Sequence, residues 1–259
     1  TSARLSPIAE YLFKDIDKNV IKEWRDNYDN TEQYPMVLPS KGFFNLVNGG
    51  YGIGVGASGS LPQYNLKELN EALITLLNNP DASFDEIYCA PDFATGAILI
   101  NADEVKESHK NGRGAACKLR SVVEWNSKER CFEVKEIPYM LYTETICKEL
   151  EEIINSENNP GIERFNDLTG KTVYIKIYLA KQANPDKVLK FLYKNTSLQS
   201  YYSINMTMLE NGRYPRVYTW KELLQAHIDH EKEVYRLGFE FALNKINKRL
   251  HIIDGLLKA

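Results

Sequence analysis

The sequence predicts an α+β fold in which a mixed or antiparallel sheet with flanking helices is followed by one long helix. Two stretches near residues 115–136 alternate like strands and are joined by a short turn. Thr219 and Glu222 form a capping-box pattern, and no proline follows them before Ala259. At about 1.5 Å per residue this helix reaches about 60 Å, longer than a compact domain needs. We therefore expect it to project as an arm.

Composition excludes several functional classes. The 259 residues carry a formal net charge of −3, so the chain is not a polycationic nucleic-acid coat, and any DNA contact must come from a local patch. No apolar run approaches the ~20 residues that span a bilayer, and the N-terminal TSARLSPIAE lacks a signal-peptide pattern. The four widely spaced cysteines fit neither a zinc site nor a disulfide scaffold. We expect reduced, partly buried thiols in a cytosolic protein without a membrane partner.

Helical patterns are clear at both ends and in the middle of the chain. Apolar residues spaced as on one helix face predict a helix over 5–24, which the turn residues at 26–30 end. Asn65 is the expected N-cap of a helix over 66–77, with Glu68 three residues later. Further helices are expected over 144–155 and from Pro185 onward.

Strand patterns lie between these helices. Residues 115–124 and 131–136 are expected to pair as a hairpin around Asn126 and Ser127. Residues 173–179 alternate apolar side chains with tyrosine or lysine, as a half-buried strand should. The end of the segment 90–100 is expected to form a buried strand.

The most unusual stretch is Pro39 to Asn65. It holds seven of the fifteen glycines and a single formal charge, Lys41. Glycine loses the most backbone freedom on folding, so such a cluster indicates left-handed backbone angles or a close approach of the main chain to a ligand. Ile53 lies between Gly52 and Gly54, where its side chain can project without bulky neighbours.

Several segments, in order, resemble the A subunit of bacterial type IIA DNA topoisomerases, gyrase and topoisomerase IV. The glycine stretch resembles the family's NG-x-x-GI-x-x-G loop, and DNYDNTEQYP resembles DNYDGTE-x-x-P with Asn30 in place of glycine. The others are APDFATGAILI, NGRG, EIPY, LYKNTSLQ, INM and RLHIIDGLLKA. Residues 57–60 and 162–169 depart from the family pattern. The resemblance implies the end of a winged-helix domain at 1–30, a tower domain at 31–215 and the start of a coiled-coil stalk at 216–259.

The resemblance also implies roles in DNA binding. In the family, the isoleucine of this loop wedges between base pairs and bends the cleaved duplex, which indicates that role for Ile53. Lys41 and Asn48 lie on the same loop and are candidates for phosphate contacts. The alternative for Ile53 is a strand residue in the hydrophobic core, and for Lys41 and Asn48 a solvated surface.

For activity, the resemblance implies a piece of an ATP-dependent isomerase. The family cuts DNA with a tyrosine in a segment R-Y-T-E-x-R-L, and the start of this chain looks like the residues that follow it. We therefore expect no catalytic residue in this piece and no cleavage by it alone. In the family, two A subunits assemble with two B subunits, which supply ATP hydrolysis and most Mg²⁺ ligands, in the bacterial cytoplasm. RLHIIDGLLKA favours topoisomerase IV over gyrase.

Other interpretations remain open. A protein of the same fold could bind DNA or act as a scaffold without cleaving it. Gly54, Gly56 and Gly59 fit a dinucleotide-binding pattern, but Pro62 to Tyr64 separate them from the expected helix start. His227 and His230, with acidic neighbours, could bind a metal ion, although a solvated helix face is the expectation.

Overall fold

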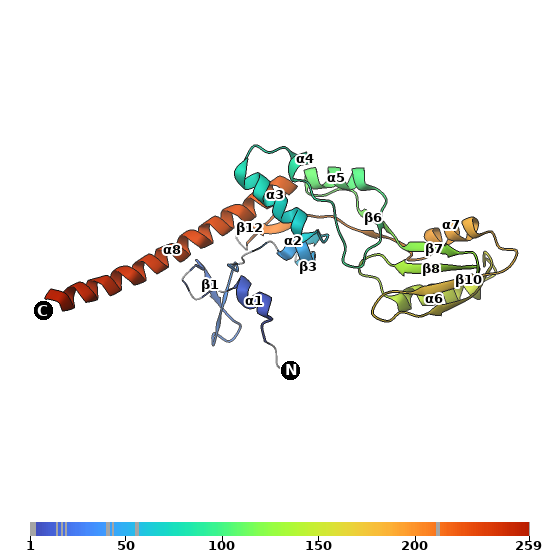
Figure 1. Cartoon of the computed structure of the whole chain (residues 1–259), viewed down its shortest axis with the longest axis horizontal. Helices are drawn as coiled ribbons and strands as arrows, with labels where there is room; N and C mark the ends of the chain where they lie inside the picture. The colour runs from blue at the N-terminus through green and yellow to red at the C-terminus, as the bar shows by residue number, and fades with distance from the viewer. Residues whose placement is uncertain are drawn as a thin grey trace.

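The computed structural model describes residues 4–13, 15–16, 18, 20–39, 42, 44–54, 57–210 and 213–258. A long helix extends away from a body of short helices and sheets, and the part containing β7, β8, β10, α6 and α7 lies at the opposite end (Figure 1). The helices are α1 (Pro7–Leu12), α2 (Phe44–Asn48), α3 (Leu66–Asn78), α4 (Phe84–Ile87), α5 (Ala102–Asn111), α6 (Thr143–Ile154), α7 (Pro185–Asn195) and α8 (Trp220–Lys258).

Every strand pair in the described residues is antiparallel. The sheets have the orders β7-β8-β10-β9, β11-β6-β5, β1-β2, β3-β4 and β12-β13. The strands are β1 (Trp24–Asp26), β2 (Gln33–Pro35), β3 (Gly50–Gly54), β4 (Ala57–Leu61), β5 (Ile98–Leu99), β6 (Cys117–Arg120), β7 (Val122–Asn126), β8 (Cys131–Glu136), β9 (Ile162–Asp167), β10 (Ile175–Leu179), β11 (Gln199–Tyr202), β12 (Thr207–Glu210) and β13 (Tyr214–Val217).

Two large hydrophobic clusters support this arrangement. One joins α3, α4, α5, the sheet β11-β6-β5 and the start of α8. Its largest buried side chain is Trp220, whose indole N–H donates to the Ile87 carbonyl over 2.7 Å. The second joins α6 and α7 to β8 and β10. Ile175, Ile177 and Leu179 alternate into it from β10, which confirms the half-buried strand.

The local helix signals are confirmed. The Asn65 side chain accepts from the backbone of Lys67 and Glu68 at the start of α3. At the start of α8, Thr219 donates to the Glu222 carboxylate from both its backbone and its hydroxyl, each over 2.9 Å. The four cysteines are free, and three of them are buried. The 39 residues of α8 correspond to about 58 Å.

The expected helix over 5–24 is wrong. The helix ends at Leu12, and Leu5 and Ile8 are 60% and 58% exposed, whereas Leu12 is buried. Val20 and Ile21 are buried in a third, small cluster with Val234 of α8. The apolar residues at the end of this stretch therefore pack against α8 and do not belong to α1.

The expected strand over 115–124 is divided between two sheets. Ser121 separates β6 from β7, and its backbone binds both α7 and the segment that follows α7. Its N–H donates to the Leu198 carbonyl over 2.8 Å, and its carbonyl accepts from the Tyr193 hydroxyl over 3.1 Å. The hairpin with residues 131–136 exists as β7-β8. The buried strand expected at the end of 90–100 exists as β5, but it is not buried, because Ile98 is 52% exposed.

A buried histidine links α5 to the first core. The His109 Nδ1 lies 2.7 Å from the Val105 carbonyl, which can only accept, so Nδ1 carries the proton. Its Nε2 then accepts from the Tyr64 hydroxyl over 2.6 Å. The rings of Tyr64, Tyr88 and Trp220 surround the imidazole. Burial lowers the pKa of His109 to about 4.

This histidine makes stability depend on pH. The unfolded state binds a proton near pH 6.5, whereas the folded state does so only near pH 4, so stability falls as the pH drops between these values. We expect His109→Gln to reduce the loss of unfolding free energy between pH 7 and pH 5 by about 2 kcal/mol, measured by urea denaturation. His251→Gln, at an exposed position of α8, is the control. An unchanged pH dependence in His109→Gln would contradict this.

Candidate nucleic-acid interface

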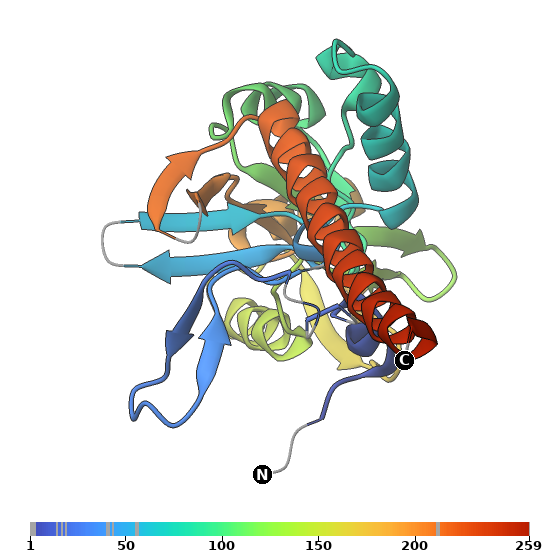
Figure 2. The ribbon, with the colours of Figure 1, turned by 90° about the vertical axis from the view of Figure 1, so that its left-hand side faces the viewer.

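The glycine stretch forms the hairpin of β3 and β4. Ile53 lies opposite Ser58, and Gly52 opposite Gly59, in antiparallel register. The two strands lie side by side and extend from the body (Figure 2). Ile53 is 75% exposed and Tyr51, two residues earlier, is 64% exposed. Because residues two apart share a strand face, these side chains present one exposed apolar surface.

The glycines of this hairpin serve different purposes. Gly49 has a φ of +69°, in the left-handed region. A Cβ atom at Gly59 would lie 2.5 Å from the Thr207 carbonyl oxygen, so β12 requires glycine there. A Cβ atom at Gly50 or Gly52 would meet nothing within 4 Å. These two glycines therefore leave the surface around Ile53 open.

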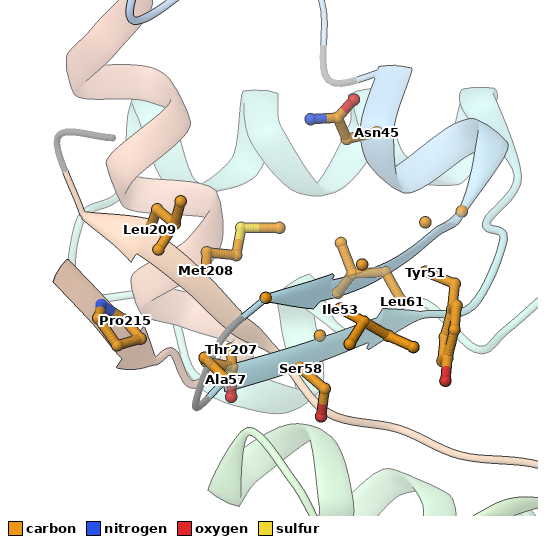
Figure 3. Close-up of a pocket in the computed structure, with 15 residues that line it drawn as sticks. Asn45, Tyr51, Ile53, Ala57, Ser58, Leu61, Thr207, Met208, Leu209 and Pro215 are labelled. Atoms are coloured by element: carbon orange, nitrogen blue, oxygen red, sulfur yellow. The ribbon is translucent and has the colours of Figure 1, made fainter. Parts of the chain in front are cut away.

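An apolar hollow of about 440 Å³ lies beside Ile53. Its walls come from the hairpin and from the neighbouring pair β12-β13, which carries Met208, Leu209 and Pro215 (Figure 3). Asn45 of α2 lines it as well. Ile53 thus lies at the edge of a concave apolar surface rather than alone on a flat one.

Gln63 fixes the base of the hairpin. Its side-chain amide donates to the Asn48 carbonyl over 2.9 Å and accepts from the Ala94 N–H over 2.8 Å. Its backbone carbonyl accepts from Asp92 over 2.8 Å. These bonds connect the end of α2 to the segment 90–100. They orient the hairpin from the side opposite its turn.

Arg113, in the NGRG segment, lies beside the hairpin. Its backbone pairs with Asn205, which also pairs with Ser60 of β4. Gly112 has a φ of +74°, and a Cβ atom there would lie 2.1 Å from the Tyr218 carbonyl oxygen, so the turn needs glycine. The Arg113 side chain is exposed and has no ion pair within the described residues. The NGRG resemblance was the only sequence signal for this cation.

Two of the three residues that the sequence predicted for DNA binding, Ile53 and Asn48, lie in the described part of the chain. Ile53 is exposed at the hairpin, so the core alternative does not hold for it. Asn48 is exposed at the end of α2, directly before the hairpin, but does not line the hollow. Lys41 lies outside the described residues. DNA binding by these three residues stays a prediction.

Other family-like segments hold the fold together. The Glu136 carboxylate, in the EIPY segment, accepts from the Ala97 N–H over 2.7 Å. Ala97 has a φ of +77°, so this bond stabilises an unusual turn. Tyr139 of the same segment packs against Phe93 and Tyr202 with ring centroids 5.2 and 5.5 Å apart. The segments APDFATGAILI and EIPY are therefore in contact.

The dinucleotide and metal alternatives gain no support. Gly54 and Gly59 lie in paired strands, not at a helix start. No group of three or more possible metal-binding side chains occurs among the described residues. The expectation of a solvated face at His227 is wrong, because its side chain is only 10% exposed and burial lowers its pKa to about 4. None of the described helices has the length and apolar character that crossing a membrane requires.

These features define an α+β protein with a projecting helix and an exposed apolar hairpin. All of the chain, residues 1–259, matches the family of the DNA gyrase/topoisomerase IV A subunit, and the chain belongs to this family. It is 36% identical over 99% of its length to the DNA gyrase A subunit of Leptospira biflexa, covering 31% of that protein. It is also 36% identical over its whole length to the DNA topoisomerase 4 A subunit of Bacillus subtilis, covering 33%. The chain thus spans about a third of the relatives it matches.

The close approach at Gly59 gives a direct test of the hairpin. We expect Gly59→Ala to lower the unfolding free energy by about 1–3 kcal/mol, because its Cβ would displace the Thr207 carbonyl. Gly52→Ala on the paired strand should change it by less than about 0.5 kcal/mol. Urea denaturation measures both. Equal stability of the two variants would contradict the packing of β12 on β4.

Proposed function

We propose that this chain is part of the DNA breakage and reunion subunit of an ATP-dependent type II topoisomerase, and that its hairpin bends the duplex that is cut. The observation that carries the proposal is the exposed Ile53, which follows Gly52, where a Cβ atom would meet nothing within 4 Å. Membership of the A-subunit family supports it. In this proposal, residues 1–30 end the winged-helix domain, 31–215 form the tower and 216–259 begin the stalk.

The physical chemistry of an isoleucine wedge fits this surface. Inserting an apolar side chain between base pairs costs a few kcal/mol of unstacking, which additional contacts along the bent duplex offset. Ile53 is already exposed, so insertion removes its apolar surface from water. The paired strand β4 and the close packing of β12 keep the backbone of the wedge in place. Such rigidity is needed if the protein is to deform the DNA.

Phosphate contacts require cations that are not already neutralised. Arg213 binds Glu23, and Arg216 binds both Glu210 and Glu222. Arg113 has no such ion pair in the described residues, and its backbone adjoins the hairpin through Asn205. We assign it a phosphate contact beside the wedge, together with the predicted contacts of Lys41 and Asn48.

The remaining parts of the proposal concern the whole enzyme. Two A subunits would assemble with two B subunits that supply ATP hydrolysis and Mg²⁺, and the enzyme would act in the bacterial cytoplasm. Relatives include A subunits of both gyrase and topoisomerase 4, and RLHIIDGLLKA favours topoisomerase IV. No tyrosine of this chain lies in an R-Y-T-E segment. Tyr142 is followed by threonine and glutamate, but Leu141 precedes it in place of an arginine. We therefore expect this chain alone neither to cleave nor to relax plasmid DNA.

The wedge is tested in the full-length protein in complex with its B partner. We expect Ile53→Ala to reduce the bend of a duplex carrying a fluorophore at each end, seen as lower energy transfer, because alanine is too short to hold base pairs apart. Ile74→Ala is the matched control, since this isoleucine is also exposed but lies on α3.

The fold should be intact in both variants, with unchanged circular dichroism. If the energy transfer of Ile53→Ala equals that of the unaltered enzyme on a duplex that both bind, the wedge is ruled out. If Ile74→Ala lowers it as much, the effect does not come from the hairpin.

A further inference from the structure

The strand β3 leaves one of its two edges without a partner. In antiparallel strands, residue pairs that exchange backbone hydrogen bonds alternate with pairs whose backbone groups point away from each other. Ser60 of β4 exchanges its two backbone hydrogen bonds with Asn205, so Tyr51, which lies opposite Ser60, also points its N–H and carbonyl away from β4. The same holds for Ile53, two residues further along. Within the described residues, no hydrogen bond occupies these four backbone groups.

This free edge lacks the features that protect the edges of two other sheets. Exposed edge strands usually carry charged side chains, proline or a bulge, which prevent pairing with another chain. The outer strand β9 carries Glu163 and Arg164, and the outer strand β13 carries Arg216. The five residues of β3, GYGIG, have neither a charge nor a proline, and their register with β4 is regular. The strand β3 therefore has no device against pairing.

The space beside β3 is open to a second extended strand. The hairpin extends from the body of the protein (Figure 2). The side chains of Tyr51 and Ile53 are largely exposed. A Cβ atom at Gly50 or Gly52 would meet nothing within 4 Å, so the intervening positions carry no bulk either. The opposite edge of the hairpin is different, because Asn205 occupies the outer side of β4. One further strand can thus be added, and only on the side of β3.

The sequence of β3 is complementary to a second copy of itself. When two such strands pair antiparallel about a twofold axis at Gly52, Tyr51 of one copy lies opposite Ile53 of the other, and the reverse. Each of these two pairs exchanges two backbone hydrogen bonds, which satisfies the free groups of both strands. An aromatic side chain opposite a β-branched one is a pair that stabilises antiparallel sheets. No like charges face each other, since β3 carries none.

From these observations we propose that two copies of this chain associate through their β3 strands into a four-stranded sheet of order β4-β3-β3-β4. The arrangement has twofold symmetry and uses the same surface on both copies. It stops at two copies, because Asn205 occupies the outer edge of each β4. One strand pair is smaller than a standard interface of about 1,600 Å², so the association is weak and depends on protein concentration.

This pairing competes with the proposed wedge. In the paired sheet, the Ile53 side chain packs beside Tyr51 of the second copy and is not free to enter a duplex. Duplex DNA that takes up Ile53 therefore dissociates the two copies. The competition rests on the proposed function, whereas the pairing of the β3 strands does not.

Sedimentation velocity of the 259-residue chain tests the association. We expect the sedimentation coefficient to rise from that of a monomer toward that of a dimer between about 5 and 500 μM protein. Ile53→Lys places a charge on the open edge and should weaken the association at least about tenfold. Ile74→Lys is the matched control, since this isoleucine is also exposed but lies on α3, and it should associate as the unaltered chain does. Thermal unfolding should show that both variants are folded.

Cysteine crosslinking tests the register. The two Gly52 residues face each other in a pair without hydrogen bonds, whose Cα atoms lie about 4.5 Å apart, within the range that a disulfide spans. We expect Gly52→Cys to form a disulfide-linked dimer on mild oxidation. Gly50→Cys is the matched control, because the two residues at position 50 would lie about 14 Å apart along the strands and should not crosslink. The four native cysteines are the same in both variants.

The outcomes are distinct. A chain that stays monomeric at every concentration overturns the pairing. Association that Ile53→Lys leaves unaltered also overturns it, because the contact then comes from another surface, such as the exposed apolar side chains of α8. Equal crosslinking of Gly50→Cys and Gly52→Cys overturns the register. Crosslinking of Gly52→Cys that saturating duplex does not reduce overturns the competition. The bending measured with Ile53→Ala tests the wedge separately, so the failure of the pairing leaves the proposed function standing.

Discussion

The attachment of the hairpin to the backbone of Asn205 is the interaction on which the candidate interface depends. Ser60 and Asn205 exchange two backbone hydrogen bonds of 2.8 and 2.9 Å, and the Asn205 side chain donates to Ser58 over 2.7 Å. A hairpin of two strands has little stability by itself in water. Without this attachment, an apolar side chain at position 53 would collapse onto the nearest apolar surface instead of remaining exposed.

The protein uses its cations in two ways. Along α8 and the pair β12-β13, arginines bind carboxylates, as Arg216 and Arg236 do, and these exposed pairs contribute little to stability. Arg113 and Arg120 form no ion pair within the described part of the chain, and Arg120 contacts the Gln199 side chain and the Tyr193 ring instead. A chain with a net charge of −3 can therefore still carry arginines whose charge is not neutralised by a carboxylate of the described residues.

Much of the family resemblance reflects the scaffold and not the surface that would contact DNA. Glu136 stabilises the turn at Ala97, and Gly112 permits the close approach of Tyr218. Gln63 connects three segments at the base of the hairpin. These buried or half-buried contacts constrain which residue type fits at each of these positions.

The sequence by itself determined the elements whose signals are local: the caps at Asn65 and Thr219, and the alternation of β10. These depend on hydrogen bonds and spacing within a few residues. Only the tertiary structure decided the exposure of Ile53, the break at Ser121 and the contacts of Arg120 with Gln199 and Tyr193. Each of these depends on a contact with residues more than seventy positions away, or on which face of a strand packs against the core. A pattern within a short stretch of sequence carries no information on either point.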